Sequence, residues 1–367
     1  RFEPQSVSSN LSHLFGEVEV IFGFWAGVLV LVLAMHSGVK AAVAHVEALN
    51  YTEALFVFVI MAVASTQPLL DLAEMVLNGL SRVLPFALAF RHYFVCLFVG
   101  PLLGSFLTEP AAMIVVALIL QQRYFRSTDS SRFKMVTLAT LLVNISIGGS
   151  LTSFAAPPVL MVASKWNWDS LFMFNHFGYK AVIAVCMNSL LATFLNFREL
   201  REILNRRGHG VVEGERSALR SRRLSFLHFI FLLAIVLMSH HAVVFMGLFL
   251  FFLGVLKVTA PFQTELRIRE SLLVAFFLGG LVVLGSMQSW WIRPILLNLN
   301  DLSLYLGTAA LTAVTDNAAL TYLGSQVEGL TLASKSALVG GALVGGGLTV
   351  MANAPNPIAF SVFKESF

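Results

Sequence analysis

Two short polar stretches, rich in glycine and proline, stand far apart in a chain that is otherwise strongly apolar. The first is GGSLTSFAAPPV from Gly148, and the second is GGGLTVMANAPNP from Gly345. Glycine and proline interrupt helices, and in hydrocarbon each unpaired backbone amide or carbonyl costs several kcal/mol. We therefore expect each stretch to break a membrane helix and to line a cavity, where protein, water or a ligand satisfies the freed groups.

Each break also carries side chains that suit a hard cation. Hydroxyl, amide and freed carbonyl oxygens are the ligands that such ions prefer, and broken helices supply them in transporters. A glycine-rich helix-packing face would explain the glycines, but not the hydroxyls, amides and prolines beside them. We expect an ion site formed by Ser150, Thr152, Ser153, Thr349, Asn353 and Asn356, which Asn144 joins from one turn before the first break.

An acidic residue precedes each break, and the two have matching neighbours. Glu109 lies in LTEPAAM at 107–113 and Asp316 in VTDNAAL at 314–320, each directly after a threonine. A carboxylate near the bilayer centre costs about 2.5 to 3.5 kcal/mol, which makes function its first explanation. Each could also cap a hairpin helix, and Pro110 suits a plain helix start beside Glu109. The two roles are compatible, and we expect the functional role at Asp316 ahead of Glu109.

A carboxylate in a cavity of low dielectric constant favours its protonated form unless a cation lies near it. The same group can therefore hold a proton or a metal ion, which is the physical basis of cation/proton exchange. Asp71 is a further candidate for a proton pathway, and Glu74 is expected to be structural. His36, His240 and His241 lie at apolar helix ends and could relay protons, although interfacial histidines are common.

The composition is that of a polytopic membrane protein. Of 367 residues, 57% are hydrophobic and 12% are charged, and the mean hydropathy is +0.81. Apolar stretches of spanning length recur, among them Val20 to Met35, Phe226 to Met238 and Leu272 to Leu284. They leave no room for a soluble domain, and the expected partner is the lipid bilayer. Cys96 and Cys186 are isolated in apolar runs, and we assign them no function.

Basic loops set the expected orientation. The segment 198–223 holds eight arginines against four glutamates, so we expect it on the cytoplasmic side of the plasma (inner) membrane. The basic loop at 121–134 is expected on the same, cytoplasmic side. The charge of +4 does not indicate nucleic acid as a partner, because the basic residues lie in short loops. The polar start RFEPQSVSSNLSH lacks the order of a signal peptide, and we expect the chain to be trimmed there.

Four motifs recur in the same order in both halves, which is typical of transporters built from repeats. They are VLAMHSG and VLMSHHA, STQP and SMQS, the two acidic motifs, and the two breaks. We divide the chain into a first transmembrane repeat at 1–200, a basic linker at 201–223 and a second, inverted repeat at 224–367. The inversion requires that 224–257 is a helical hairpin bent at Ser239-His240-His241.

The expected fold is an all-α polytopic membrane protein, an inverted-repeat secondary transporter with two broken helices and two re-entrant hairpins. Counting crossings from the basic loops makes 86–122 and 302–329 the hairpins, with Glu109 and Asp316 at their tips. Two spans are the alternative for 86–122, whose first arm is long enough to cross.

A hairpin motif followed by a broken helix, given twice, resembles the ion transporter superfamily. TEPAAM, GGSLTSFAAPP, TDNAALTYLGS and GGGLTVMANAPNP are most similar to its Na+/H+ antiporter family, and the similarity covers most of the chain. The resemblance implies scaffold helices around the hairpins, a homodimer, an elevator-like movement, Na+ as the transported or coupling ion and no cofactor. By position it implies a site of Thr108, Glu109, Asn144, Ser150, Thr152, Thr315, Asp316, Asn317, Thr349 and Asn353.

The leading hypothesis is a secondary antiporter, not an enzyme, that exchanges a monovalent cation for protons. The alternative is a Na+- or H+-coupled transporter of a carboxylate or other small anion, with half-helix N-termini facing the substrate. Neither break contains Arg or Lys, and the Ser-Asn-Thr hairpin signature of carboxylate-transporting relatives is absent, which favours a cation. An intramembrane enzyme is a third class, but no HExxH, GxGD pair or GxSxG setting occurs.

Overall fold

The computed structural model describes residues 18–83, 85, 88–207, 218–260, 266 and 268–366. Within these ranges every regular element is helical, and no strand occurs. Six segments are long and apolar enough to cross a membrane, namely Val20–Ser37, Phe90–Leu107, Ser131–Leu151, Ser170–Leu195, Ala242–Thr259 and Ile268–Gly285. A bent pair, Val39–Ala48 with Thr52–Ala64, would add a seventh. The all-helical, polytopic architecture is therefore confirmed.

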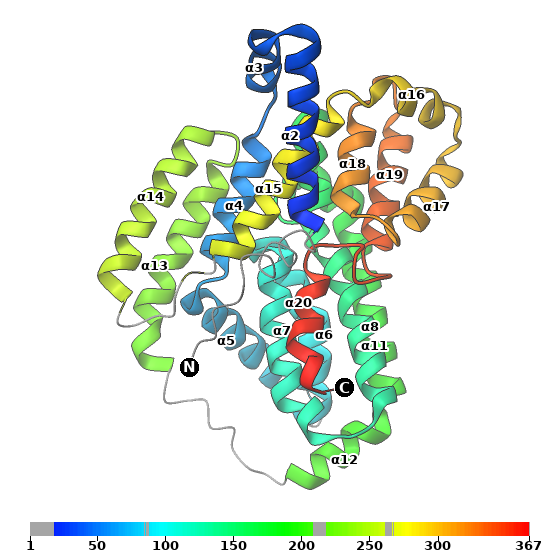
Figure 1. The fold of residues 1–367 in the computed structure, drawn as a ribbon. Helices are drawn as coiled ribbons and strands as arrows, with labels where there is room; N and C mark the ends of the chain where they lie inside the picture. Colours follow the sequence, from blue (N-terminus) through cyan, green and yellow to red (C-terminus); the bar gives the residue numbers. More distant parts are fainter. Residues whose placement is uncertain are drawn as a thin grey trace, which may run out of the picture.

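The first half of the chain forms helices α2 to α12 (Figure 1). They are α2 (Val18–Ser37), α3 (Val39–Ala48), α4 (Thr52–Ala64), α5 (Gln67–Val83), α6 (Leu88–Leu107), α7 (Glu109–Arg123), α8 (Ser131–Gly148), α9 (Pro157–Trp166), α10 (Ser170–Met173), α11 (Tyr179–Leu195) and α12 (Phe197–Arg207). Local chemistry sets several ends. Ser130 caps α8, two prolines open α9, and Asn167 closes α9 in a left-handed conformation.

The second half forms helices α13 to α20. They are α13 (Ala218–Leu237), α14 (Ala242–Thr259), α15 (Ile268–Gly285), α16 (Ser289–Asn298), α17 (Asp301–Thr312), α18 (Asn317–Ser325), α19 (Leu332–Gly345) and α20 (Asn356–Phe363). The turn between α13 and α14 lies at the predicted Ser239–His241 bend. α12 and α13 extend into the expected linker 201–223 from either side, and residues 208–217 lie outside the described ranges, as does the chain start before Val18.

Both predicted helix breaks are present. α8 ends at Gly148 and the chain becomes helical again at Pro157, after a single 3-10 turn at Gly149–Leu151. α19 ends at Gly345, and α20 begins at Asn356. Close backbone approach requires glycine at the first break, because a side-chain carbon on Gly148 would lie 2.8 Å from the backbone of Pro101 on α6.

Helices of the two halves interleave around the core. α20 contacts α7, α9 contacts α18, and α4 contacts α15. In Figure 1, α20 runs beside α7 in the lower part of the molecule, whereas α17, α18 and α19 lie at the upper right. Each short helix that follows a break therefore packs against the second arm of the hairpin from the opposite half.

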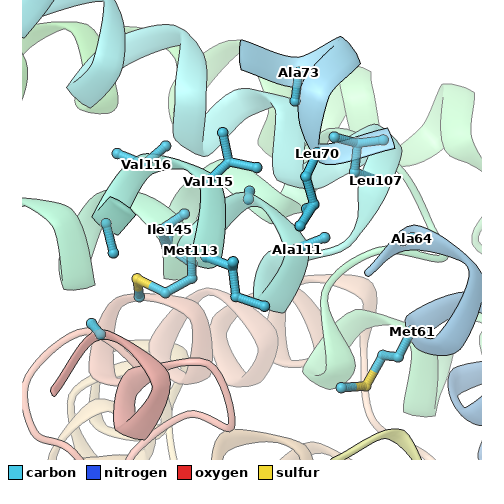
Figure 2. Packing of buried hydrophobic residues seen from close by; sticks show 14 of the residues in the cluster. Met61, Ala64, Leu70, Ala73, Leu107, Ala111, Met113, Val115, Val116 and Ile145 are labelled. Carbon is cyan, nitrogen blue, oxygen red and sulfur yellow. The ribbon is translucent and has the colours of Figure 1, made fainter. Parts of the chain in front are cut away.

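A continuous apolar cluster encloses α7. Every residue from Glu109 to Ala117 on this helix is buried. Figure 2 shows Met113, Val115 and Val116 of α7 packed among Ile145 of α8 and Leu70 of α5. A helix that is apolar on all sides belongs to an interior. The single acidic residue at its start therefore lies in a medium of low dielectric constant.

Candidate functional site

A fully buried carboxyl group stands at the start of α7. Glu109 is 0% exposed, and its Oε2 accepts a hydrogen bond of 2.7 Å from Nδ2 of Asn353 in the second break. Its other oxygen, Oε1, has no hydrogen-bond partner, and Oδ1 of Asn353 has none either. A buried polar atom left without a partner costs about 1–3 kcal/mol. Two such oxygens on bonded side chains are acceptors that a ligand could satisfy.

The backbone of the first break packs directly on this carboxyl group. A side-chain carbon on Gly149 would overlap Oε1 of Glu109 and would lie 2.7 Å from its Cγ. Only glycine fits at this distance. The first half therefore supplies both the carboxylate and the backbone beside it, and the second half supplies the amide.

Asn317 occupies the corresponding place in the second half. It is the first residue of α18, is 0% exposed, and neither polar atom of its side chain has a hydrogen-bond partner. A side-chain carbon on Gly346 of the second break would lie 2.7 Å from its Nδ2. In both halves, the first residue after the hairpin turn is buried against the second glycine of its own break.

Asp316 caps the N-terminus of α18. Its Oδ1 accepts hydrogen bonds from the N–H groups of Ala318, at 2.8 Å, and Ala319, at 3.1 Å. Its side chain is partly exposed, and its charge acts on that of Glu109. The capping role that the sequence left open therefore applies to Asp316. Thr315 is exposed, and its hydroxyl donates to Leu311 O at 2.8 Å within its own turn.

Thr108 joins α6 to α7 in a strained conformation. Its φ is 123° and its ψ is 152°, a region that residues with a Cβ rarely adopt. Its side chain is 3% exposed, and its hydroxyl has no hydrogen-bond partner. Such strain costs about 1–3 kcal/mol, persists only where the surroundings impose it, and concentrates at functional sites.

The hydroxyls of the two breaks hold the breaks to their hairpins. Thr152 donates to Ser105 O at the end of α6, and Thr349 donates to Ala313 O at the end of α17, both at 2.7 Å. The two threonines occupy the same position in GGSLT and GGGLT. Each break is therefore fixed by the same bond to the first arm of its own hairpin.

The other predicted break residues differ in their hydrogen-bond partners. Ser150 donates to Ile147 O at 2.7 Å, and Ser153 lies 3.2 Å from the hydroxyl of Ser170. Asn356 donates from Nδ2 to Gly346 O and Thr349 O, at 2.8 and 2.7 Å, and its Oδ1 has no partner. Asn356 thus satisfies carbonyls freed by the break and keeps one acceptor for a ligand.

Two of the predicted residues, Asn144 and Asp71, have hydrogen-bond partners away from the Glu109–Asn353 pair. The side chain of Asn144 donates to Leu97 O at 2.9 Å and to Ser189 at 3.0 Å, which ties α8 to α6 and α11. Asp71 accepts a bond of 2.7 Å from Gln67 on its own helix, α5.

Three buried hydroxyls at the site escaped the sequence reasoning. Ser105 donates to Gly148 O at 2.6 Å and accepts from the Leu151 N–H at 2.9 Å, so it satisfies backbone groups that the first break frees. Ser146 donates to Leu343 O at 2.7 Å and links the two broken helices. Thr312 is buried with no partner for its hydroxyl. Ser105 and Thr312 each stand four residues, one helical turn, before the acidic residue, and this spacing would have identified them.

The apolar spanning helices and the buried polar interior define an integral, multi-pass membrane protein. The whole chain also matches a family model described as "Putative Na+/H+ antiporter", over residues 2–367. The chain belongs to this family, and it is a membrane transport protein of the antiport class. Among proteins with curated descriptions, none matches the chain.

Proposed function

We propose that this protein exchanges Na+ for protons and that Glu109 is the group at which the two compete. The observation that carries the proposal is the fully buried Glu109 carboxyl, bonded to Asn353 of the opposite half and beside oxygens that no group donates to. Alkali cations take oxygen ligands in such surroundings. The candidate ligand atoms are Thr108 Oγ1, Glu109 Oε1, Thr312 Oγ1, Asn317 Oδ1, Asn353 Oδ1 and Asn356 Oδ1.

The chemistry of exchange follows from burial. An isolated negative charge in a low-dielectric interior is costly unless a cation or a proton neutralises it. Either Na+ or H+ can satisfy Glu109, and binding of one removes the reason to bind the other. The negative charge of Asp316 adds to the attraction for a cation from the opposite hairpin.

The same contacts support an inverted arrangement with the site near the bilayer midplane. The matched bonds of Thr152 and Thr349, and the matched packing of α9 on α18 and α20 on α7, relate the halves. α17 and α18 have 12 and 9 residues, well short of the about 20 that a span needs, which supports a re-entrant hairpin. α6 is long enough to cross.

The remaining parts of the proposal concern the surroundings. We place the protein in the plasma (inner) membrane with the basic segment 198–223 in the cytoplasm, because positive loops stay on that side. The homodimer and the elevator-like movement stay predictions from the resemblance. Within residues 149–156 and 346–355 no Arg or Lys stands ready for an anion, so a carboxylate substrate has no support there.

The test is proton flux in liposomes that contain the purified protein and a pH-sensitive dye. Addition of Na+ should dissipate an imposed proton gradient, and K+ and Li+ give the selectivity. Glu109→Gln should abolish the response, while Asp316→Asn, which keeps a capping side chain, should weaken it. Asp301→Asn, an exposed acidic residue bonded to Ser334, is the matched control. Full exchange by Glu109→Gln would refute the assignment, and flux with organic acids alone would favour an anion transporter.

A further inference from the structure

Two core helices are interrupted by kinks that take no part in the ion site. α4 ends at Ala64 before α5 begins, and α15 ends at Gly285 before α16 begins. At the first kink, Thr66 donates its hydroxyl to Val63 O at 2.8 Å. At the second, Ser286 donates to Val283 O, also at 2.8 Å.

Each kink hydroxyl also contacts a histidine from the opposite half. Nδ1 of His228, on α13, lies 2.9 Å from Thr66 Oγ1, and Nε2 of His45, on α3, lies 3.1 Å from Ser286 Oγ. Because each hydroxyl gives its own proton to a carbonyl, the imidazole N–H must be the donor in each pair. His228 and His45 do not occupy equivalent positions in the two halves. In both pairs, however, an imidazole N–H donates to the kink hydroxyl.

We propose that His228 and His45 are positioning residues that hold the two kinks, and that proton uptake by His228 releases the first one. With Nδ1 as the donor to Thr66, the other nitrogen of His228 carries no proton. That nitrogen, Nε2, is buried and has no hydrogen-bond partner, and the ring stands edge-on to Phe252 at 5.0 Å. A proton there places a positive charge among apolar groups with no acceptor.

Among the side chains that the structure describes, the charged groups on α13 and its neighbouring helices are engaged elsewhere or exposed. α4, α5 and α14 pack against α13. On α4, Glu53 bonds Ser164, and on α5, Asp71 bonds Gln67 while Glu74 pairs with Arg123 at 3.6 Å. Arg82, Lys257 and Arg223, on α5, α14 and α13, are exposed. The ring of His228 bonds Thr66 and stands edge-on to Phe252.

The first kink is placed to act on the ion site. α4 and α5 both contact α7. Figure 2 shows Leu70 and Ala73 of α5 beside Leu107 and Ala111, which flank the strained hairpin turn. A kink that loosens would relax the packing around the turn that carries Glu109. We assign the proton uptake to His228, whose side chain is fully buried.

Variants can separate the positioning role of His228 from its proton uptake. His228→Asn places an amide N–H near the position of Nδ1 and does not titrate, and His45→Gln does the same for Nε2. His228→Ala and Thr66→Val each remove the first contact. His241→Asn changes an exposed histidine at the start of α14 and is the control.

The first readout is hydrogen exchange of segment 65–72 in detergent, corrected for the intrinsic exchange rate. It is measured at pH 8 and pH 6, which lie on either side of the pKa of an ordinary histidine. It does not depend on transport, so it stands if Na+/H+ exchange fails. We expect protection in the wild type and in His241→Asn to fall by about fourfold on acidification, whereas His228→Asn changes by less than about twofold. His228→Ala and Thr66→Val should be weakly protected at both pH values.

The second readout is the pH profile of exchange in liposomes, which rests on the proposed function. His228→Asn should keep the wild-type rate at pH 8 and lose less of it at pH 6. The same loss of protection in His228→Asn as in the wild type would overturn proton uptake by His228. Normal protection in both His228→Ala and Thr66→Val would overturn the positioning role itself.

Discussion

Asn353 and Glu109 lie 244 residues apart in the sequence and meet through one hydrogen bond of 2.7 Å. The bond fixes the orientation of the amide, because Nδ2 is committed to the carboxyl group and Oδ1 is left as an acceptor. One oxygen on each side chain is then left without a hydrogen-bond donor, an arrangement that disfavours an anion. The geometry around this pair makes several predictions.

Replacing Asn353 should weaken cation binding more than it weakens folding. Asn353→Ala removes one ligand oxygen and leaves Glu109 Oε2 without its donor. A hydrogen bond to a charged group is worth about 1.5–3 kcal/mol, so the Na+ concentration for half-maximal exchange should rise by about tenfold to a hundredfold. Asn298→Ala, at an exposed amide that bonds Pro294 O, should leave it unchanged. An unaltered Na+ dependence in Asn353→Ala would remove this residue from the site.

A single methyl group at the first break should stop exchange. In Gly149→Ala the new carbon would lie 2.7 Å from Cγ of Glu109, so the carboxyl group must move. Misplacing a reacting group by about 1 Å costs about a hundredfold in rate. Gly307→Ala on α17 is the control, because a carbon added there meets no atom within 4 Å. Exchange rates of the two variants in liposomes, at matched protein content, test the prediction.

Substitutions at Thr108 should change the stability of the protein and its Na+ affinity separately. Thr108→Gly accepts a positive φ and should raise the free energy of unfolding by about 1 kcal/mol, seen as a higher melting temperature in detergent. It also lacks the hydroxyl, so Na+ affinity should fall. Thr108→Val keeps the strain and loses the hydroxyl, so affinity should fall without the gain in stability. If Thr108→Gly melts below the wild type, the conformation of this residue is not a source of strain.

Ser105 should matter for the stability of the broken helix. Ser105→Ala leaves Gly148 O and the Leu151 N–H without their side-chain partner. Each unpaired buried group costs about 1–3 kcal/mol, so the melting temperature should drop by several degrees. Ser303→Ala, at an exposed position on α17, provides the comparison. Equal melting of the two variants would mean that other groups satisfy the first break.

The helices and both breaks could be predicted because their causes are local. The lengths of apolar runs fix spanning helices, and glycine with proline ends them wherever they occur. The break between Gly148 and Pro157 therefore follows from sequence letters alone. The same holds for the turn at Ser239–His241 and for the hydroxyl and amide types in the breaks.

The partners of side chains could not be predicted, because they depend on which helices pack together. Asn144 bonds Leu97 O on α6 and Ser189 on α11, which lie 47 and 45 residues away along the chain. The two acidic motifs also differ in which of their residues is buried. Thr108 is the cap of α7 and Asp316 is the cap of α18, so the second helix begins one residue later in the motif. Glu109 and Asn317, not Glu109 and Asp316, are then the first helical residues, and they are the buried ones.

The packing of α20 on α7 has a consequence for the biosynthesis of this protein. Gln121 donates to Val362 O at 2.5 Å at one end of α7, and Glu109 accepts from Asn353 at the other. Ribosomes make the first hairpin more than two hundred residues before its partner exists. Until Asn353 is made, the nascent chain carries the Glu109 carboxyl group without the amide that donates to it in the folded protein. A bound proton would remove that negative charge in the meantime, and synthesis of the second break allows the Glu109–Asn353 pair to form.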